Sequence, residues 1–197
     1  MLIQGALSIC RTTGGNKMHS AEIYISGGCG SAVRMDVKSS KRNRSDINYT
    51  VTTNFEHDSI KNSLDTAYYF AKSILEKTGN KYLDANMLHF SVKNKDFYQH
   101  RYTGPSSGSS IALCILSECL QRPLPGEIAI TGQISGHGEL HDVGSVKEKL
   151  LAASKLGKTV FYVPKDNAAE ATDLEIRDID VRPIENMSTV LRDLWDI

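Results

Sequence analysis

The chain has no excess of charge of either sign. Among its 197 residues, 23 Lys and Arg residues balance 23 Asp and Glu residues, so the formal net charge at pH 7 is zero. A nucleic-acid-binding domain needs a sustained basic surface. The densest basic run, KSSKRNR at residues 38–44, contains no aromatic residue. We therefore expect a solvated loop at residues 38–44 and no nucleic-acid partner.

Cysteine is scarce and has no motif spacing. The four cysteines are Cys10, Cys29, Cys114 and Cys119. They form no CxxC pair, and no Cys/His cluster has the spacing of zinc ligands. We expect four reduced thiols in a reducing compartment, no metal site and no disulfide.

Long apolar runs are absent as well. No stretch approaches the roughly 18 apolar residues that a membrane-spanning helix needs, and the N-terminus lacks the pattern of a signal peptide. We expect an intracellular protein with no membrane partner. The cytoplasm fits best, and another reducing compartment such as the mitochondrial matrix is also compatible.

The chain does contain an alternation of strand and helix patterns. Residues 5–53 hold four short β-rich segments separated by Gly, Ser and Asn clusters. Residues 58–78 have apolar residues at helical spacing, and residues 86–92 have a strand pattern. Residues 93–105 have no periodicity and predict a loop. The first half is thus expected to be a sheet followed by a helix.

The second half alternates more regularly. The expected elements are a helix at 107–121, a strand at 127–134, a turn at 135–138, a strand at 139–143, a helix at 145–156, a strand at 159–164, a helix from about 166, a strand at 180–184 and a helix at 187–195. This alternation predicts an α/β or α+β fold.

The segment GPSSGSS, at residues 104–110, precedes the first of these helices. It is either a flexible linker or a tight turn that presents a serine at the start of the helix. Glycines at 104 and 108 permit a sharp turn, and a helix that begins after Ser106 would aim unpaired N–H groups at the hydroxyl. A serine that merely caps the helix is the simpler alternative. The segment lacks the G-x-S-x-G pattern of α/β-hydrolases.

A nucleophilic serine needs a base. None of the six histidines has a diagnostic spacing to Ser106, although His100 lies in the preceding loop. The alternative base is a lysine in VGSVKEKLLAASKLG, residues 143–157. Ser145 and Glu148 have the spacing of a capping box, which predicts that Ser145 is the N-cap of a helix.

Helical periodicity separates the lysines of this segment. One apolar stripe comprises Val146, Leu150, Ala153 and Gly157. Lys149 lies at the edge of that stripe, whereas Lys147 and Lys155 lie on the opposite face. A partly buried lysine has a lowered pKa and can act as a base near neutral pH. In the alternative, Lys149 buries its stem and keeps its ammonium in water.

At this point the sequence resembles the proteolytic domain of Lon proteases. The matching residues are Gly104-Pro105-Ser106, Ile130-Thr131-Gly132, Gly144, Lys147-Glu148-Lys149, Ala152-Ala153, Val163-Pro164 and Asn167. The serine and the lysine of the family are 43 residues apart, as are Ser106 and Lys149. Several motifs in this order and spacing are more specific than a lone glycine-rich turn.

The resemblance implies roles for individual residues. Ser106 would be the nucleophile and Lys149 the general base, and Thr131 would orient the lysine through its hydroxyl. The oxyanion would be bound by backbone N–H groups of the turn that contains Gly104, Ser107 and Gly108. The implied reaction is acyl transfer to the serine followed by hydrolysis, which requires no metal and no organic cofactor.

The resemblance also implies an organisation. Weaker matches in QGALSI and LHFSV suggest one Lon-like domain over residues 1–197, with a sheet and helix at 1–92, an active-site loop at 93–105 and a catalytic part at 106–197. Its fold would be the Lon proteolytic-domain fold, related to a ribosomal-protein-like topology. Family members form six-membered rings, so a homo-oligomer is expected. The chain has no Walker motif, so ATP would matter only if an ATPase domain lies elsewhere in a longer protein.

The chain departs from the family pattern in the substrate-facing region. Thr103 replaces an acidic residue, Gln133 replaces a glutamate, Ser145 replaces a glycine, and the loop at 93–103 shares little with the family. A catalytically silent domain used for assembly or peptide binding is therefore an alternative. Because Ser106 and Lys149 are both present, the sequence favours an active serine endopeptidase that cleaves unfolded polypeptides or loops.

Overall fold

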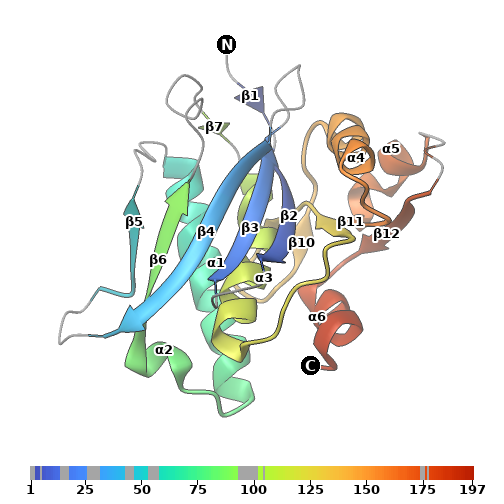
Figure 1. The fold of residues 1–197 in the computed structure, drawn as a ribbon. Helices are drawn as coiled ribbons and strands as arrows, with labels where there is room; N and C mark the ends of the chain where they lie inside the picture. Colours follow the sequence, from blue (N-terminus) through green and yellow to red (C-terminus); the bar gives the residue numbers. More distant parts are fainter. Residues whose placement is uncertain are drawn as a thin grey trace.

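A computed structural model describes the backbone of the chain except at residues 1–2, 5, 14–17, 26–31, 43–46, 53–57, 93–101, 104, 174–175 and 177. Side chains are described for residues 36–42, 47–51, 61–91, 105–173, 176 and 178–197. Within these residues, an eight-stranded sheet combines strands from both halves of the chain (Figure 1).

The main sheet is mixed. Its strands, in spatial order, are β12 (Asp180–Ile184), β11 (Val160–Pro164), β8 (Ile128–Ile130), β2 (Ala6–Thr13), β3 (Met18–Ile25), β4 (Ala32–Lys41), β6 (Asn86–Val92) and β5 (Tyr49–Thr52). The first three strands are parallel to one another, β2, β3, β4 and β6 form an antiparallel run, and β5 lies parallel to β6 at the far edge. The β8 and β2 strands join these two parts through the pairing of Ser8 with Ile130. Two short pairs lie outside the sheet: β1 (Ile3–Gln4) with β7 (Tyr102–Thr103), and β9 (Gln133–Ile134) with β10 (Leu140–His141).

The helices are α1 (Asp58–Lys77), α2 (Tyr82–Ala85), α3 (Gly108–Leu120), α4 (Val146–Lys155), α5 (Ala168–Thr172) and α6 (Met187–Trp195), with 3₁₀ turns η2 (Pro105–Ser107) and η3 (Lys165–Asn167). The α3 helix packs against α1 on one side and against β2, β3 and β4 on the other. Every residue of α3 from Gly108 to Cys119 is buried. A helix that is apolar around most of its circumference is typical of such a central position.

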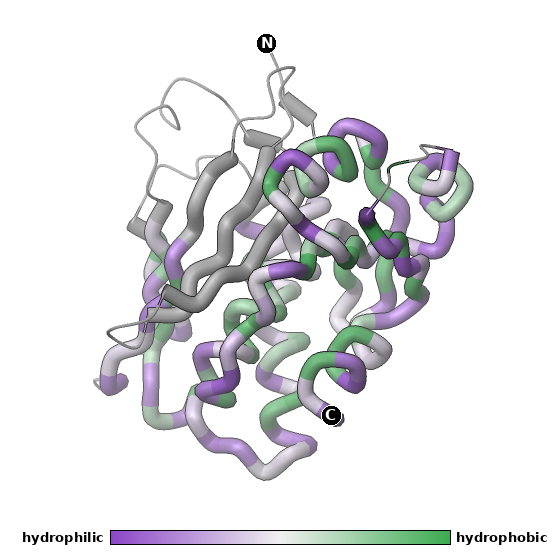
Figure 2. The backbone as a smooth tube through the Cα atoms, turned by 45° about the vertical axis from the view of Figure 1, so that its right-hand side comes forward, coloured by the Kyte–Doolittle hydropathy of each residue, from purple (hydrophilic) through white to green (hydrophobic). Residues whose placement is uncertain are grey.

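The other helices are amphipathic. Figure 2 shows this in the alternating hydrophobic and hydrophilic residues of α6, close to the C-terminus. One hydrophobic core lies around α1 and α3, and a second, smaller one lies between α4, α5 and the strands β8 and β11. In the smaller core, Val146, Leu150 and Ala153 are fully buried, which confirms three members of the stripe predicted from the sequence. The fourth, Gly157, lies beyond α4 and is exposed.

The α/β class is confirmed, and the segments at 86–92, 180–184 and 187–195 form the expected elements. The predicted solvated loop at 38–44 is wrong in its first half, because β4 continues to Lys41. There Lys38 pairs with His89 in β6. Ser39 on the inner face donates a hydrogen bond to the buried carboxylate of Glu118 at 2.6 Å. This inward serine, which a charge count overlooks, explains why a basic run forms a strand.

Three further predictions need correction. The expected strand at 127–134 divides into β8 and β9, and only Leu140 and His141 of the expected strand at 139–143 form one. The helix expected from about residue 166 begins as the 3₁₀ turn η3 and becomes α-helical at Ala168. Most of the loop predicted at 93–105 lies outside the described residues.

Cys114 and Cys119 are buried and are not joined by a disulfide, whereas the side chains of Cys10 and Cys29 lie outside the described residues. In the part of the chain that the structure describes, no helix combines the length and apolarity needed to cross a bilayer. The same described residues contain no cluster of three or more His, Cys, Asp or Glu side chains suited to a metal ion.

Candidate active site

Ser106 lies in η2, immediately before the buried helix α3, and is 3% exposed. Its backbone carbonyl accepts hydrogen bonds from the amide of Gly132 at 3.1 Å and from Thr131 Oγ1 at 3.5 Å. The amide of Ser109 in turn donates to the carbonyl of Gly132 at 3.2 Å. The serine turn is thus fixed to the chain at the point where β8 ends, which excludes a flexible linker at residues 105–110.

The break between β8 and β9 makes this attachment possible. Thr131 still bonds to the sheet through its amide, which donates to the carbonyl of Tyr162 at 3.1 Å. Gly132 then leaves the sheet to reach Ser106. A Cβ atom at Gly132 would lie 2.1 Å from Leu140 Cδ2, so a side chain there requires Leu140 to move. The predicted continuous strand is interrupted because its middle residues bind the serine turn.

The other residues of the turn have structural roles that the sequence did not reveal. Ser107 is the N-cap of α3, but its side chain makes no capping hydrogen bond. The capping alternative concerns Ser106, and this observation on Ser107 does not test it. Gly108 permits close packing, since an added Cβ would lie 2.8 Å from Ile134 Cγ2. Gly104 lies outside the described residues.

Lys149, in the first half of α4, is fully buried. Its neighbour Lys147 is exposed and forms an ion pair with Asp173 at 3.9 Å. The Nζ atom of Lys149 is itself buried and has no hydrogen-bond partner among the described residues. The alternative of an ammonium held in water is therefore wrong for Lys149. Burial lowers the pKa of Lys149 to about 8, and the negative charges of Glu170 and Glu148 partly oppose this effect.

The predicted capping box is wrong, although Ser145 is indeed the N-cap of α4. Ser145 has a left-handed backbone with φ of 59°, and its side chain makes no capping hydrogen bond. The acceptor is Glu170 of α5, whose Oε1 accepts from the amides of Val146 at 3.0 Å and Lys147 at 3.4 Å. A cap supplied 24 residues later by another helix leaves no local signal in the sequence.

The η2 turn and α4 both contact β2, so this strand links the segment that carries Ser106 with the helix that carries Lys149. The hydroxyl of Thr131 donates to the carbonyl of Ser106. That contact positions the backbone of the serine turn, whereas orientation of Lys149 by Thr131 stays a prediction. Chemically, the arrangement offers a rigidly held hydroxyl and an amine that loses its proton close to neutral pH.

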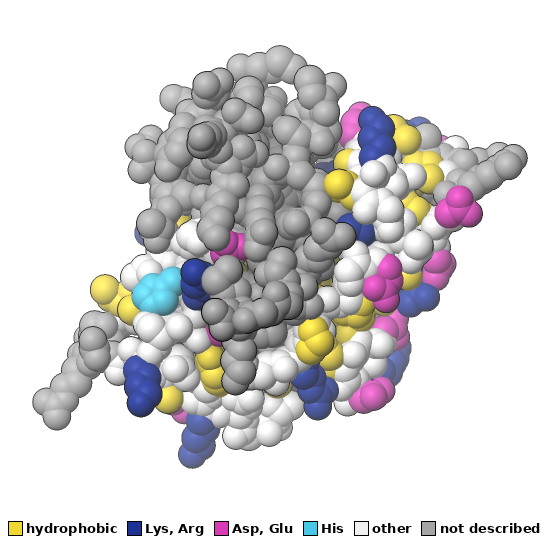
Figure 3. All heavy atoms as spheres, viewed as in Figure 1, with side chains coloured by type: hydrophobic (Ala, Val, Ile, Leu, Met, Phe, Trp, Pro, Cys, Tyr) yellow, Lys and Arg dark blue, Asp and Glu magenta, His cyan; other side chains and the backbone are white. Residues whose placement is uncertain are grey.

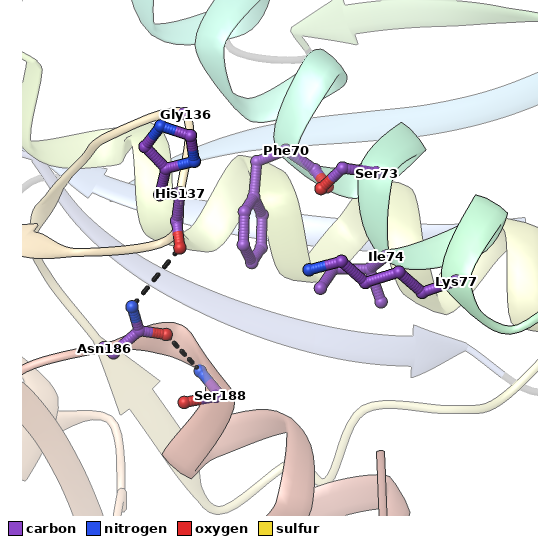
Figure 4. A pocket seen from close by; sticks show the side chains of 8 residues that line it. All are labelled: Phe70, Ser73, Ile74, Lys77, Gly136, His137, Asn186 and Ser188. Atoms are coloured by element: carbon purple, nitrogen blue, oxygen red, sulfur yellow. Dashed lines mark hydrogen bonds between the residues drawn. The ribbon is translucent and has the colours of Figure 1, made fainter.

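A pocket of about 410 Å³ lies elsewhere, between α1, the turn at 136–138 and the start of α6 (Figure 4). Asn186 lies at its edge, where its side chain donates to the carbonyl of His137 at 3.3 Å and accepts from the amide of Ser188 at 2.9 Å. The hydroxyl of Ser73 donates to the carbonyl of Phe70 at 2.7 Å. The side chains of Asn186 and Ser73 therefore bond to nearby backbone groups. None of the residues that line the pocket is a buried base. The pocket therefore lacks the chemistry found around Ser106 and Lys149.

On the face shown in Figure 3, both basic and acidic side chains are present over the described residues. Among the described ion pairs, Arg182 contacts Asp180 at 2.6 Å and Asp193 at 3.6 Å.

Comparison with known families identifies the domain that contains this site. Residues 28–196 match the family model of the Lon protease (S16) C-terminal proteolytic domain. The chain belongs to this family. The resemblance inferred from the motifs is thereby confirmed. The match begins before β4 and does not include β1, β2 and β3.

Individual Lon proteases show the same relationship. The chain is 34% identical to the Lon protease of Clostridioides difficile over 119 residues, which are 59% of this chain and 15% of that protein. It is 35% identical to the mitochondrial Lon protease homolog of Caenorhabditis elegans over 129 residues, which are 62% of this chain and 13% of that protein. The Lon protease of Endomicrobium trichonymphae is 29% identical over 153 residues, or 73% of this chain and 18% of that protein. The chain thus spans less than a fifth of the length of these relatives.

Proposed function

We propose that this Lon-type domain is a serine endopeptidase in which Ser106 is the nucleophile and Lys149 is the general base. The observation that carries the proposal is the complete burial of Lys149, with an Nζ atom that has no hydrogen-bond partner among the described residues. An unpaired buried amine is costly for a fold. Such a cost is typical of a functional site, where a perturbed pKa matches the chemistry.

The lowered pKa determines how much base is present. With a pKa of about 8, about a tenth of the molecules carry a neutral amine at pH 7, whereas an ordinary lysine would be neutral in fewer than about one molecule in a thousand. The neutral amine takes the proton of the Ser106 hydroxyl as the oxygen attacks the peptide carbonyl. The resulting ammonium then protonates the leaving amine, which leaves an acyl-enzyme.

In the second half of the reaction, water is the nucleophile and Ser106 is the leaving group. The amine of Lys149 removes a proton from water, which attacks the acyl-enzyme, and the resulting ammonium returns a proton to Ser106 Oγ as the ester bond breaks. Backbone N–H groups at the start of α3 are suited to stabilise the oxyanion. The amide of Ser109 already donates to Gly132, so Ser107 and Gly108 are the candidate donors. No step calls for a metal or an organic cofactor.

The substrate class follows from the chain itself. The sequence has no Walker motif with which to drive unfolding, so the domain alone would cut unfolded polypeptides or accessible loops. We further propose that it acts as a homo-oligomer, with a six-membered ring as the family arrangement, in the cytoplasm or another reducing compartment. ATP would be needed only through an ATPase domain of a longer protein.

The test is cleavage of casein without ATP by the wild-type protein and by Ser106→Ala, Lys149→Ala and Lys147→Ala. We expect the first two variants to lose cleavage and Lys147→Ala, a matched exposed lysine on the same helix, to retain it. A fluorophosphonate probe should label Ser106, as detected by mass spectrometry of the modified peptide. Full activity of Ser106→Ala would refute the assignment of the nucleophile. Absence of both cleavage and labelling in the wild type would instead support a silent domain.

A further inference from the structure

The start of α4 has no cap from its own segment. The first amides of a helix have no intrahelical acceptor, so side chains or water must satisfy them. Ser145 at the N-cap has a left-handed backbone and makes no side-chain bond to the first turn. The sequence around residue 145 therefore leaves the entry into this helix unsupported.

The support comes from the segment formed by η3 and α5. Glu170 accepts from the amides of Val146 and Lys147 at 3.0 and 3.4 Å. Asn167, three residues before Glu170, binds Val143, which lies three residues before the start of α4. Its Oδ1 accepts from the Val143 amide at 2.9 Å, and its Nδ2 donates to the Val143 carbonyl at 3.0 Å. These contacts fix both the approach to α4 and its first turn.

This support reaches the lysine in two ways. Lys149 lies three residues after Val146 on the same rigid helix, so the orientation of the first turn determines where the amine points. Glu170 also acts on Lys149 through its charge. Its effect on the lysine exceeds that of Glu148, the other carboxylate acting on this amine. One carboxylate thus serves as a cap for the helix and as a counter-charge for the amine.

We propose that Glu170 is a positioning residue for the catalytic lysine, capping α4 from the neighbouring helix and setting both the placement and the protonation of the Lys149 amine. What this says about catalysis rests on the proposed peptidase function. The structural part stands on the hydrogen bonds to Val146 and Lys147 alone.

The sign of the charge effect is defined. Burial lowers the pKa of Lys149, and Glu170 raises it by favouring the ammonium form. Removing the charge of Glu170 therefore lowers the pKa further. Glu148 of α4 also raises the pKa of Lys149.

The strands β2 and β3 also pack against α4. Their charged or titratable residues are Cys10, Arg11, His19, Glu22 and Tyr24, whose side chains lie outside those described.

The first experiment needs no catalysis. Hydrogen exchange at the amides of Val146 and Lys147, together with an NMR titration of the Lys149 side chain, is measured for Glu170→Ala, Glu170→Gln and Asp173→Asn. Glu170→Ala should speed exchange at both amides and lower the pKa of Lys149. Glu170→Gln retains an oxygen acceptor, so it should lower the pKa while the amides stay protected. Unchanged exchange and titration in Glu170→Ala would overturn the proposal.

The matched control is Asp173→Asn, which removes an exposed carboxylate at the end of the same helix. It should leave both readouts at wild-type values. A change as large as that in Glu170→Ala would show that any loss of charge in this segment suffices, which contradicts a specific role for Glu170.

The second experiment measures catalysis. Misplacement of a catalytic group by about 1 Å can cost up to about a hundredfold in rate, so we expect Glu170→Ala to lower kcat about tenfold or more with little change in KM. Glu170→Gln should keep most of kcat at alkaline pH and shift the acidic limb of the rate profile to lower pH. A lower Tm with unchanged kcat per folded molecule and an unchanged limb would mean that Glu170 is only structural. Full cleavage by Ser106→Ala would refute the peptidase function instead, while the exchange data would still decide the role of Glu170.

Discussion

Replacing Lys149 by Met removes a buried ammonium and keeps an unbranched side chain in the same space. Burial moves the pKa of Lys149 from its ordinary value of 10.5 to about 8. A difference of this size corresponds to about 3 kcal/mol of stability that the folded protein forgoes while both the folded and the unfolded chain carry the charge. Lys149→Met should therefore be more stable than the wild type at pH 7.

The pH dependence is the more specific part of this prediction. The folded pKa is lowered, so below about pH 8 the lysine is charged in both states and the full cost is present. Between about pH 8 and pH 10.5, only the unfolded chain binds the proton, and the wild type gains stability as the pH rises. The advantage of Lys149→Met should therefore shrink by about 2 kcal/mol between pH 7 and pH 9.5.

Urea denaturation followed by circular dichroism at several pH values measures this difference, with Lys147→Met as the control. Lys147 is exposed, so its replacement should show little dependence on pH over the same range. A constant difference between the wild type and Lys149→Met across the range would refute the reasoning, because it would show that the amine titrates alike in the folded and unfolded chains. An equal pH dependence of the stability difference for Lys147→Met would also refute the reasoning.

Two further predictions concern the site. If the neutral amine of Lys149 is the base, kcat/KM for a short peptide should rise with pH through a limb centred near pH 8, and a flat profile from pH 6 to pH 9 would contradict it. Gly132→Ala should lower the free energy of unfolding by about 1–3 kcal/mol, since its Cβ would lie 2.1 Å from Leu140 Cδ2. Gly144→Ala, where nothing lies within 4 Å, is the matched control in thermal denaturation. Equal Tm values for the two variants would show that the chain relaxes around the added methyl group.

Local patterns predicted the parts of the site that depend on neighbouring residues. The helical spacing of Val146 and Leu150 placed Lys149 at the edge of the buried stripe and Lys147 on the opposite face, because a helix fixes side-chain direction. It did not decide whether the amine of Lys149 is buried or stays in water. The same reasoning misassigned the cap of this helix, where a plausible serine at 145 makes no bond and Glu170 supplies the acceptor. Pairwise contacts across the fold leave no periodic signal.

The interruption of the strand after Ile130 has the same origin. Apolar character favours a continuous strand through residue 134, but the amide of Gly132 is needed by the carbonyl of Ser106. The basic run at 38–41 joined the sheet because Ser39 reaches a buried carboxylate on α3. In each case a long-range hydrogen bond outweighed the local preference. A single sequence shows the residues of such a bond but not their proximity.

The way β8 joins β2 has a consequence for the order in which the protein can mature. The parallel and antiparallel parts of the sheet are joined by the pairing of Ser8 with Ile130, so they cannot join until residue 130 has been made. Pairing between residues this far apart in the sequence is slow to form. Because domains form as the chain emerges from its N-terminus, the serine at 106 is synthesised long before the carboxylate at 170 that holds the lysine-bearing helix. Under the proposed function, a chain still under synthesis would carry the nucleophile without a positioned base. The segment that contains Glu170 would then delay peptide cleavage until this part of the domain has been made.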